Sequence, residues 1–289
     1  MFDKTIVSEK YINIDSTVDE NKNDYLKNEP FPNILLDDFF NENFLNEVLK
    51  DFPDLSKVNN SQKYRNKDEV KFANNDYENF PSSIKKLFDF MNSSVFLEFL
   101  QQITSIKEKL VADPELNGGG LHEIKSGGLL KIHTDFNRHP TLDLDRRVNI
   151  LIYLNNNWSE AYGGDLELWD KEMKFCGKKI KPTFNKMVIF STDDFSNHGH
   201  PDPINCPENI SRKSIALYYF SKGRPIEELD IKNLKNKTYF KNRKGFINET
   251  SYKNEKIKNF FRKFKFYQYL KSIEKKYLRK KKKINLWKN

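Results

Sequence analysis

The chain has 289 residues, with 50 Lys and Arg against 41 Asp and Glu, and its net charge of +9 is unevenly spread. Residues 231–289 contain 21 basic and 3 acidic side chains, so this tail carries +18 and the remaining 230 residues carry −9. The apolar runs are too short to cross a bilayer, and the N-terminus lacks the pattern of a secretory signal. Two cysteines cannot form a disulfide framework or a paired-cysteine zinc motif, so we expect a soluble protein of the reducing cytoplasm.

The first 109 residues predict a polar lead-in followed by supporting helices. Residues 1–29 are polar and weakly patterned, which favours an extended lead-in. Residues 30–109 begin with a short apolar strand and are expected to belong to the same domain as the sequence that follows. A charged, Asn-rich stretch at 58–79 predicts a loop. Apolar residues at helical spacing predict helices over Asn41–Asp51, after Pro81, and over Val95–Ile103.

Between residues 110 and 225 the pattern changes to short strands. Apolar or alternating runs are separated by Gly, Asn, Asp and Pro, which is typical of an antiparallel sandwich or barrel. Helices followed by strands predict an α+β fold, in which helices pack on one side of a jelly roll. The expected strands are Leu121–Ile124, Leu129–Asp135, Val148–Leu154, Asp165–Trp169, Met187–Phe190 and Ser214–Phe220.

Residues 226–289 form a basic, aromatic tail, in which residues 260–284 are the best helix candidate. Lys and Arg interleaved with Phe and Tyr fit three interpretations. A helix can dock its aromatic side chains on the acidic body and leave its lysines in water. Alternatively, the tail contacts an anionic membrane surface or glycolipid, which would place a cytoplasmic protein peripherally at the membrane. Nucleic acid is the weaker third alternative, and the sequence indicates no oligomeric state.

All five histidines lie between residues 122 and 200, inside the strand-rich region. His133 and Asp135 end a predicted strand at positions i and i+2, so their side chains point to one face and can bind one metal ion. His198 lies near the start of a later strand. Two histidines and one carboxylate form the facial triad of non-haem Fe(II) oxygenases, and the same ligand set can bind zinc and activate water.

The last predicted strand carries a second polar group. Arg212 and Ser214 share one of its faces, where a guanidinium beside a hydroxyl suits a buried dicarboxylate. His-x-Asp, a distal His and then Arg-x-Ser resembles the 2-oxoglutarate- and Fe(II)-dependent oxygenases, in their prolyl-4-hydroxylase-like branch. The resemblance covers residues 110–225 closely and 31–53 loosely. The flanking motifs agree in order: Gly127-Gly128, Ile152-Tyr153-Leu154-Asn155 with Trp158, and Gly163-Gly164-Asp165-Leu166-Glu167-Leu168.

This resemblance implies a catalytic double-stranded β-helix over residues 110–225, supported by residues 30–109. It implies Fe(II) as the metal cofactor and 2-oxoglutarate and O2 as cosubstrates, with ascorbate as a candidate reductant. The default reaction is hydroxylation of a prolyl peptide, a sugar or glycan, or a small molecule, with release of succinate and CO2. Desaturation or cyclisation would leave the same motifs. The residues implied are His133, Asp135 and His198 for the metal and catalysis, and Arg212, Ser214 and Tyr153 for 2-oxoglutarate.

Other assignments stay open from the sequence. His200 competes with His198 as the distal ligand, although His198 fits the family pattern better. His122 either points into the same cavity or is a buried, hydrogen-bonded side chain, and His139 is expected on an exposed loop at the mouth. Two other functions fit parts of the pattern. One is a zinc hydrolase with the same three ligands, and the other is a non-catalytic jelly-roll module that binds an anionic glycan, membrane surface or nucleic acid.

Overall fold

The computed structural model describes residues 1–229 and 237–243, which belong to one compact unit ending at Arg243. Among the described residues, no helix is long and apolar enough to span a membrane. The helices are α1 (Ile14–Lys27), α2 (Glu42–Asp51), α3 (Ser82–Met91) and α4 (Ser94–Thr104), with short 3-10 turns at Glu9–Tyr11, Tyr77–Asn79, Glu160–Tyr162 and Ile226–Glu228. The strands are β1 (Asn33–Asp37), β2 (Gln62–Arg65), β3 (Glu69–Asn74), β4 (Val111–Ala112), β5 (Gly120–Ile124), β6 (Leu129–Thr134), β7 (Asp145–Tyr153), β8 (Leu166–Trp169), β9 (Cys176–Ile180), β10 (Lys186–Ser191), β11 (Asn197–His200), β12 (Arg212–Ser221) and β13 (Tyr239–Phe240).

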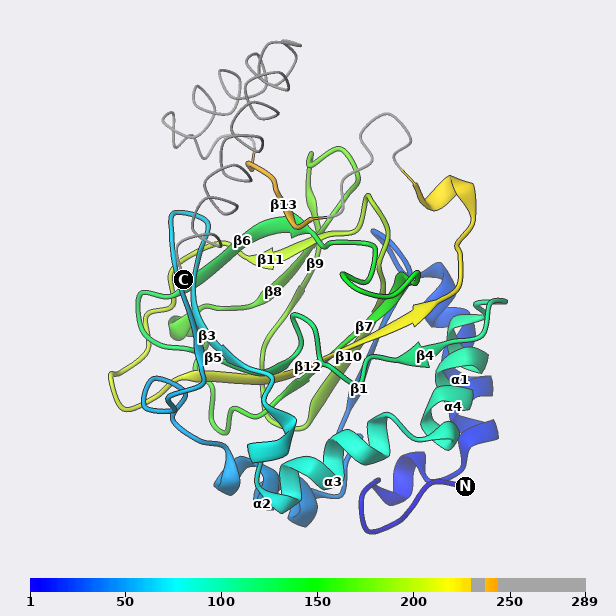
Figure 1. Ribbon diagram of the computed structural model, residues 1–289, viewed down its shortest axis with the longest axis horizontal. Helices are drawn as coiled ribbons and strands as arrows, with labels where there is room; N and C mark the ends of the chain where they lie inside the picture. Colours follow the sequence, from blue (N-terminus) through cyan, green and yellow to red (C-terminus); the bar gives the residue numbers. More distant parts are fainter. Residues whose placement is uncertain (230–236, 244–289) are drawn as a thin grey trace, which may run out of the picture. The chain divides into compact units, whose positions relative to one another are not determined.

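The described strands form a single antiparallel sheet that curls on itself (Figure 1). Its order is β1-β10-β7-β12-β5-β3-β6-β11-β8-β9, and β2, β4 and β13 attach to β3, β12 and β6. This half-barrel, like that of a double-stranded β-helix, brings β6 and β11 across from β7 and β12 around one cavity. The prediction of an α+β fold with N-terminal helices beside an antiparallel sheet is confirmed.

Alternation along the central strands gives the sheet two different faces. In β7, Val148, Ile150 and Ile152 join the main apolar core, whereas Asn149 and Leu151 line the cavity on the opposite face. β12 alternates in the same way. Burial of apolar side chains on the helix-covered face stabilises the fold. The concave face can therefore contain polar side chains without loss of this apolar core.

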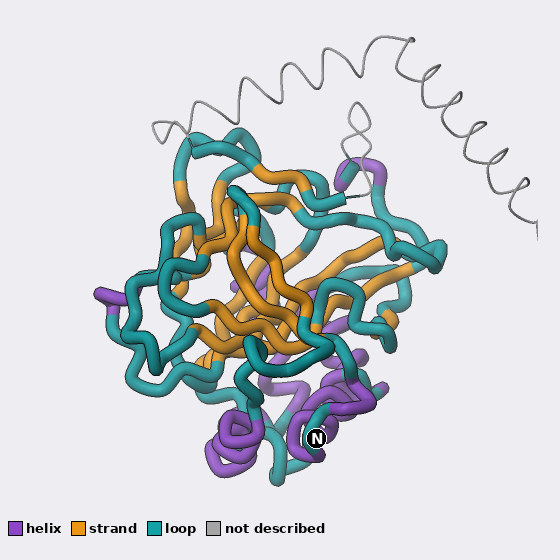
Figure 2. Tube along the Cα trace, turned by 60° about the vertical axis from the view of Figure 1, so that its left-hand side comes forward, coloured by secondary structure: helices purple, strands orange, loops and turns teal. Residues whose placement is uncertain are grey.

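The helices pack on one side of the sheet, as both views show (Figures 1 and 2). α3 and α4 contribute fully buried residues such as Leu87 and Phe96 to the core. α4 is capped at its N-terminus, since the Ser93 side chain accepts a hydrogen bond from the backbone N–H of Phe96. The predicted helices and strands thus occur close to their expected positions.

Two expectations for the N-terminal part are wrong. Residues 1–29 are not extended, because α1 lies within them and buries Val18 and Tyr25 in the core. The Tyr25 hydroxyl also bonds the Ser191 hydroxyl at 2.7 Å, which ties the helix to β10. The stretch 58–79 is not a loop, because it contains the β2–β3 hairpin. Its strands alternate too weakly to be recognised, since most β2 side chains are exposed.

The sheet also includes residues beyond 225. Tyr239 and Phe240 form β13, which pairs with β6 at Thr134 and His133. Arg243 forms an ion pair with Asp202. The remainder of the basic tail, including the predicted helix at 260–284, lies outside the described residues.

Candidate active site

A cavity of about 210 Å³ opens inside the curled sheet. Its walls come from β2, β3, β5, β6, β7, β8, β10, β11 and β12. Five of the polar residues singled out from the sequence line it. These are His133, Asp135, His198, Arg212 and Ser214. The curl of the sheet is what brings these residues together, because they are up to 81 positions apart in the chain.

Three predicted metal ligands meet at one end of this cavity. His133 on β6 lies directly opposite His198 on β11, and Asp135 follows β6 immediately. Nε2 of His133 lies 3.4 Å from Oδ1 of Asp135, and Nε2 of His198 lies 3.4 Å from its Oδ2. One ligand atom from each residue falls within 4.8 Å of the others, which is compatible with a single metal ion.

Both histidines are oriented by the backbone. Nδ1 of His133 lies 2.8 Å from the carbonyl oxygen of Lys131, and Nδ1 of His198 lies 3.0 Å from that of Ser196. A proton on each Nδ1 makes these contacts hydrogen bonds and leaves the Nε2 lone pairs directed at Asp135. Burial lowers the pKa of His198 to about 4, although Asp135 opposes this, so its imidazole is neutral and able to ligate at physiological pH.

The Asp135 carboxylate is held by two residues that sequence reasoning missed. Its Oδ2 accepts hydrogen bonds from Nη2 of Arg146 at 2.8 Å and from Nδ2 of Asn149 at 2.7 Å. Burial favours the protonated acid, but the charge of Arg146 opposes it, and the pKa of Asp135 lies well below its usual range. The sequence signal that could have indicated these two residues is the presence of polar side chains in the otherwise apolar run of β7.

Arg146 itself is buried between two aromatic rings. It is 1% exposed, its guanidinium lies 3.3 Å from the ring centroid of Tyr218, and Phe136 flanks it at 4.7 Å. The backbone carbonyl of Arg146 accepts a hydrogen bond from Arg224. This packing fixes the guanidinium against Asp135, so the ligand carboxylate has one preferred orientation.

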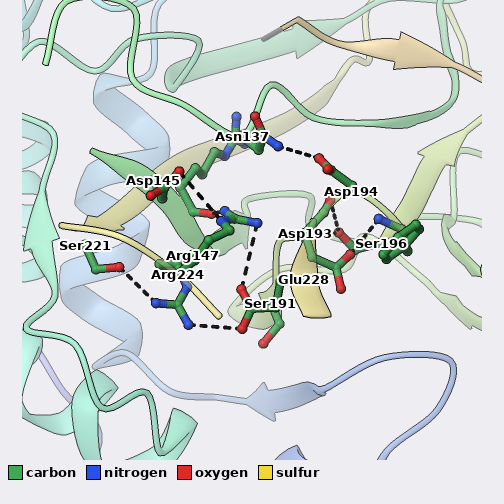
Figure 3. A network of polar contacts seen from close by, with 12 residues as sticks. Asn137, Asp145, Arg147, Ser191, Asp193, Asp194, Ser196, Ser221, Arg224 and Glu228 are labelled. Carbon is green, nitrogen blue, oxygen red and sulfur yellow. Dashed lines mark hydrogen bonds and ion pairs between the residues drawn. The ribbon is translucent and has the colours of Figure 1, made fainter. Parts of the chain in front are cut away.

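A partly buried polar network holds this end of β7 in place (Figure 3). Arg147 donates to the Ser221 hydroxyl at 2.9 Å and to a carboxylate oxygen of Glu228 at 3.1 Å. It also pairs with Glu108 at 2.7 Å. The network therefore connects the start of β7 to the end of β12 and to the segment around Glu228. Arg147 is the chain neighbour of Arg146, which binds Asp135, so the network holds that part of β7 in place.

Arg212 and Ser214 line the cavity from β12. Nε of Arg212 donates to the carbonyl of Gly164 at 2.8 Å, and its Nη2 donates to the Tyr153 hydroxyl at 3.2 Å. Ser214 is paired with His122 on one neighbouring strand and with Tyr153 on the other. The guanidinium is thus fixed in direction by its own partners while its side chain remains part of the cavity wall.

Tyr153 lies behind Arg212 and is not among the residues that line the cavity. It is fully buried beside Leu168 and Phe190, and burial raises the pKa of its hydroxyl, although Arg212 opposes this. Its hydroxyl oxygen is the acceptor for Arg212. The geometry supports a role for Tyr153 in positioning Arg212, and its expected direct contact with 2-oxoglutarate stays a prediction.

The other three histidines have different environments. His122 and His200 line the cavity. The expectation of an exposed His139 is wrong, since its side chain is 1% exposed. Its Nε2 lies 3.3 Å from Oδ1 of Asp113, and its ring packs edge-on against Phe220. The loop predicted at the mouth therefore folds back onto the body, which buries this side chain.

Gly199 explains how His198 can lie so close to β6. A Cβ atom on Gly199 would lie 2.7 Å from the carbonyl oxygens of Leu130 and Lys131, which is too close for any side chain. β11 also changes register between His198 and His200, so only His198 lies opposite His133. The glycine therefore permits the close strand pairing that the three ligands require.

Comparison with known proteins agrees with this geometry. Residues 119–220 match the model of the 2OG-Fe(II) oxygenase superfamily. This matched segment contains the His-Asp-His triad and is that of a 2-oxoglutarate/Fe(II)-dependent oxygenase, and the family implies Fe(II) and 2-oxoglutarate as its metal and cosubstrate.

Solved prolyl hydroxylases share the fold of this oxygenase. A prolyl hydroxylase from Trichoplax adhaerens, in complex with a hypoxia inducible factor oxygen degradation domain peptide fragment, is 19% identical, with 76% of this chain and 96% of that chain covered and a TM-score of 0.55. A prolyl-4-hydroxylase from Pseudomonas putida is 13% identical, with 72% and 100% covered and a TM-score of 0.51. No curated protein is significantly similar to the sequence.

Proposed function

We propose that this oxygenase hydroxylates an aliphatic carbon of its substrate. One oxygen atom of O2 enters the substrate C–H bond and the other enters succinate, while 2-oxoglutarate loses CO2. The observation that carries this proposal is the complete His133, Asp135 and His198 set facing the same cavity as Arg212. Bound Fe(II) would supply the redox centre that couples the two oxidations.

The protein groups have separate tasks in this reaction. The two imidazoles and the Asp135 carboxylate would hold the metal through the atoms that already face one another. Three protein ligands leave other metal positions for 2-oxoglutarate and O2. Arg212 and Ser214 would seat the far carboxylate of 2-oxoglutarate, because a fixed guanidinium and a hydroxyl both donate to carboxylate oxygens.

For the primary substrate we propose a prolyl peptide. The cavity wall combines aromatic rings from Phe136 and Tyr218 with the polar hairpin residues Gln62 and Lys71. The aromatic rings can pack against the pyrrolidine ring of a proline, and the polar side chains can hydrogen-bond the peptide amides beside it. The two solved prolyl hydroxylases with this fold make this substrate class the first to test.

The site is tested by an anaerobic titration with Fe(II) and then 2-oxoglutarate, in which a visible charge-transfer band is monitored. The band should appear with the native chain and be absent in His198→Ala. Its absence from the native chain would contradict the proposed function and favour zinc chemistry. Succinate release above the uncoupled rate is then compared for prolyl peptides, free sugars and small molecules, and stimulation only by the latter two would overturn the peptide substrate.

We also propose that the basic tail contacts an anionic membrane surface. The +18 charge of residues 231–289 and the aromatic residues among its lysines support this. Each basic residue near an anionic leaflet contributes about 1 kcal/mol to binding. Such a contact would bring an acidic catalytic body to a membrane-associated substrate.

A further inference from the structure

Two buried histidines outside the metal site line the same cavity and have ring nitrogens without partners. His200 is 3% exposed, and neither of its ring nitrogens has a hydrogen-bond partner among the described residues. Nε2 of His122 is buried and unpartnered in the same way. Buried polar atoms in proteins nearly always have a partner, so these nitrogens indicate a group that binds in the cavity.

The strand register places His122 beside the two residues assigned to 2-oxoglutarate. His122 on β5 is directly opposite Ser214 on β12, and Arg212 is opposite Ile124, two positions further along β5. Residues two apart on a strand share a face, so His122, Ser214 and Arg212 project on the same side. All three line the cavity.

His200 comes from the facing wall, on β11. Because the β11–β6 register shifts after His198, His200 lies opposite Leu130 and does not join the cluster of three metal ligands. It lines the cavity together with Arg212 and His122. An apolar side chain would fill this position without burying unpaired nitrogens, so packing alone does not account for a histidine here.

We propose that His200 donates a hydrogen bond to the distal carboxylate of 2-oxoglutarate, completing a site of three donors with Arg212 and Ser214. Neither ring nitrogen of His200 has a partner among the described residues, so its N–H is available to a carboxylate oxygen. His122 lines the same site but is not a fourth donor, because its one N–H pairs with the backbone of Gly118 and its Nε2 carries only a lone pair. This inference rests on the proposed function, because it requires 2-oxoglutarate in this cavity. It makes His200 a binding residue that selects a cosubstrate with a second carboxylate.

The test measures cosubstrate affinity in the full-length chain loaded with Mn(II), so that no turnover is needed. Calorimetry compares 2-oxoglutarate with 2-oxopentanoate, which lacks the distal carboxylate. In His200→Leu, 2-oxoglutarate should bind about tenfold to a hundredfold more weakly, as expected for a lost hydrogen bond to a charged group, whereas His122→Leu should cause a smaller loss. The affinity for 2-oxopentanoate should change less than about twofold, and His200→Gln should restore part of the loss.

The Mn(II) affinity, followed by water-proton relaxation, separates the possible outcomes. Unchanged 2-oxoglutarate affinity, or equal losses for both ligands with Mn(II) affinity intact, would overturn the inference. If the native chain binds Mn(II) but no 2-oxoglutarate, the proposed function itself fails. Should the leucine variants not fold, histidine-selective 15N NMR of the native Zn(II) form provides a second test. Addition of N-oxalylglycine should then shift the imidazole signals of His200, and unchanged His200 signals would overturn the inference.

Discussion

The Asp135 carboxylate serves the metal and two protein donors at the same time. Arg146 and Asn149 both bind its Oδ2, so the donors neutralise part of the charge that a cation would otherwise meet. The charge of Arg146 also helps to keep the Asp135 carboxyl group ionised when no metal is bound. The site therefore gains a fixed and deprotonated ligand at the cost of some attraction for the cation.

Replacing the guanidinium with Arg146→Gln should lower Mn(II) affinity about tenfold to a hundredfold at pH 7, because Asp135 loses its charged partner and its fixed orientation. The loss should grow as the pH is lowered, since protons then compete for the carboxylate. Isothermal titration at several pH values measures this. Arg147→Gln is the matched control, because that neighbouring arginine is equally buried but pairs with Glu108 and Glu228. Equal losses in the two variants would argue against a specific role for Arg146.

Arg212 should affect the cosubstrate and spare the metal. In Arg212→Ala, 2-oxoglutarate should bind at least about tenfold more weakly, since a charge-assisted hydrogen bond to its carboxylate is lost. Fe(II) affinity should stay within about twofold, because Arg212 makes no contact with the three metal ligands. Both affinities are measured anaerobically. A parallel loss of metal and cosubstrate would show that Arg212 is a structural residue.

At the scale of elements, the position of β11 decides whether a metal site exists. β11 is four residues long and is paired on both edges, with β6 and β8. Gly199 lets it approach β6 closely enough for His198 to lie opposite His133. The metal site thus depends on a backbone approach as much as on the three ligands.

Gly199→Ala should displace β11 and lower Mn(II) affinity by at least about tenfold, because the new Cβ would overlap two backbone carbonyl oxygens of β6. Thermal unfolding of the metal-free protein reports the accompanying loss of stability. Gly177→Ala in β9 is the control, since its nearest neighbours are ring atoms of Pro30, away from the metal ligands. Native-like metal affinity in Gly199→Ala would contradict the argument.

For the whole molecule, buried neutral histidines make stability depend on pH. Burial lowers the pKa of His122 from 6.5 to about 3. As the pH falls below about 6.5, the unfolded chain binds a proton that the folded chain cannot bind, so the free energy of unfolding should decrease by up to about 1.4 kcal/mol per pH unit. Urea unfolding of the metal-free protein between about pH 4.5 and 6.5 measures this slope, and His122→Gln should reduce it. An unchanged slope in that variant would assign the effect to other groups.

The proposed membrane contact predicts that the basic tail and the catalytic unit can be separated. Removal of Lys244–Asn289 keeps β13 and Arg243, so uncoupled 2-oxoglutarate turnover should persist. Sedimentation with phosphatidylserine vesicles should be lost, whereas neutral vesicles should bind neither form. Replacement of Lys280–Lys283 by glutamine provides a matched control that weakens binding without shortening the chain. Vesicle binding by the truncated chain, or binding of RNA by the full chain in preference to vesicles, would contradict the membrane proposal.

The local sequence determined most of the secondary structure and the chemistry of the metal site. Apolar periodicity identified α2, α3 and α4, and the order of the motifs, through its resemblance to a known family, indicated the triad and the arginine. Apolar periodicity did not identify α1 or the β2–β3 hairpin, because the many polar residues in these segments make the periodicity weak. Their formation depends on burial against distant strands, as in the contact between Tyr25 and Ser191.

Only the tertiary structure decided which residues surround those motifs. Arg146 reaches Asp135 because β7 and β6 face each other across the curled sheet, and no spacing along the chain encodes that approach. The burial of His139, and of the unpartnered ring nitrogens of His122 and His200, depends equally on the closure of the sheet. A pattern in the sequence can show which face of a strand a side chain occupies. What lies opposite that face is decided by strand pairing and curvature, which involve residues far apart in the chain.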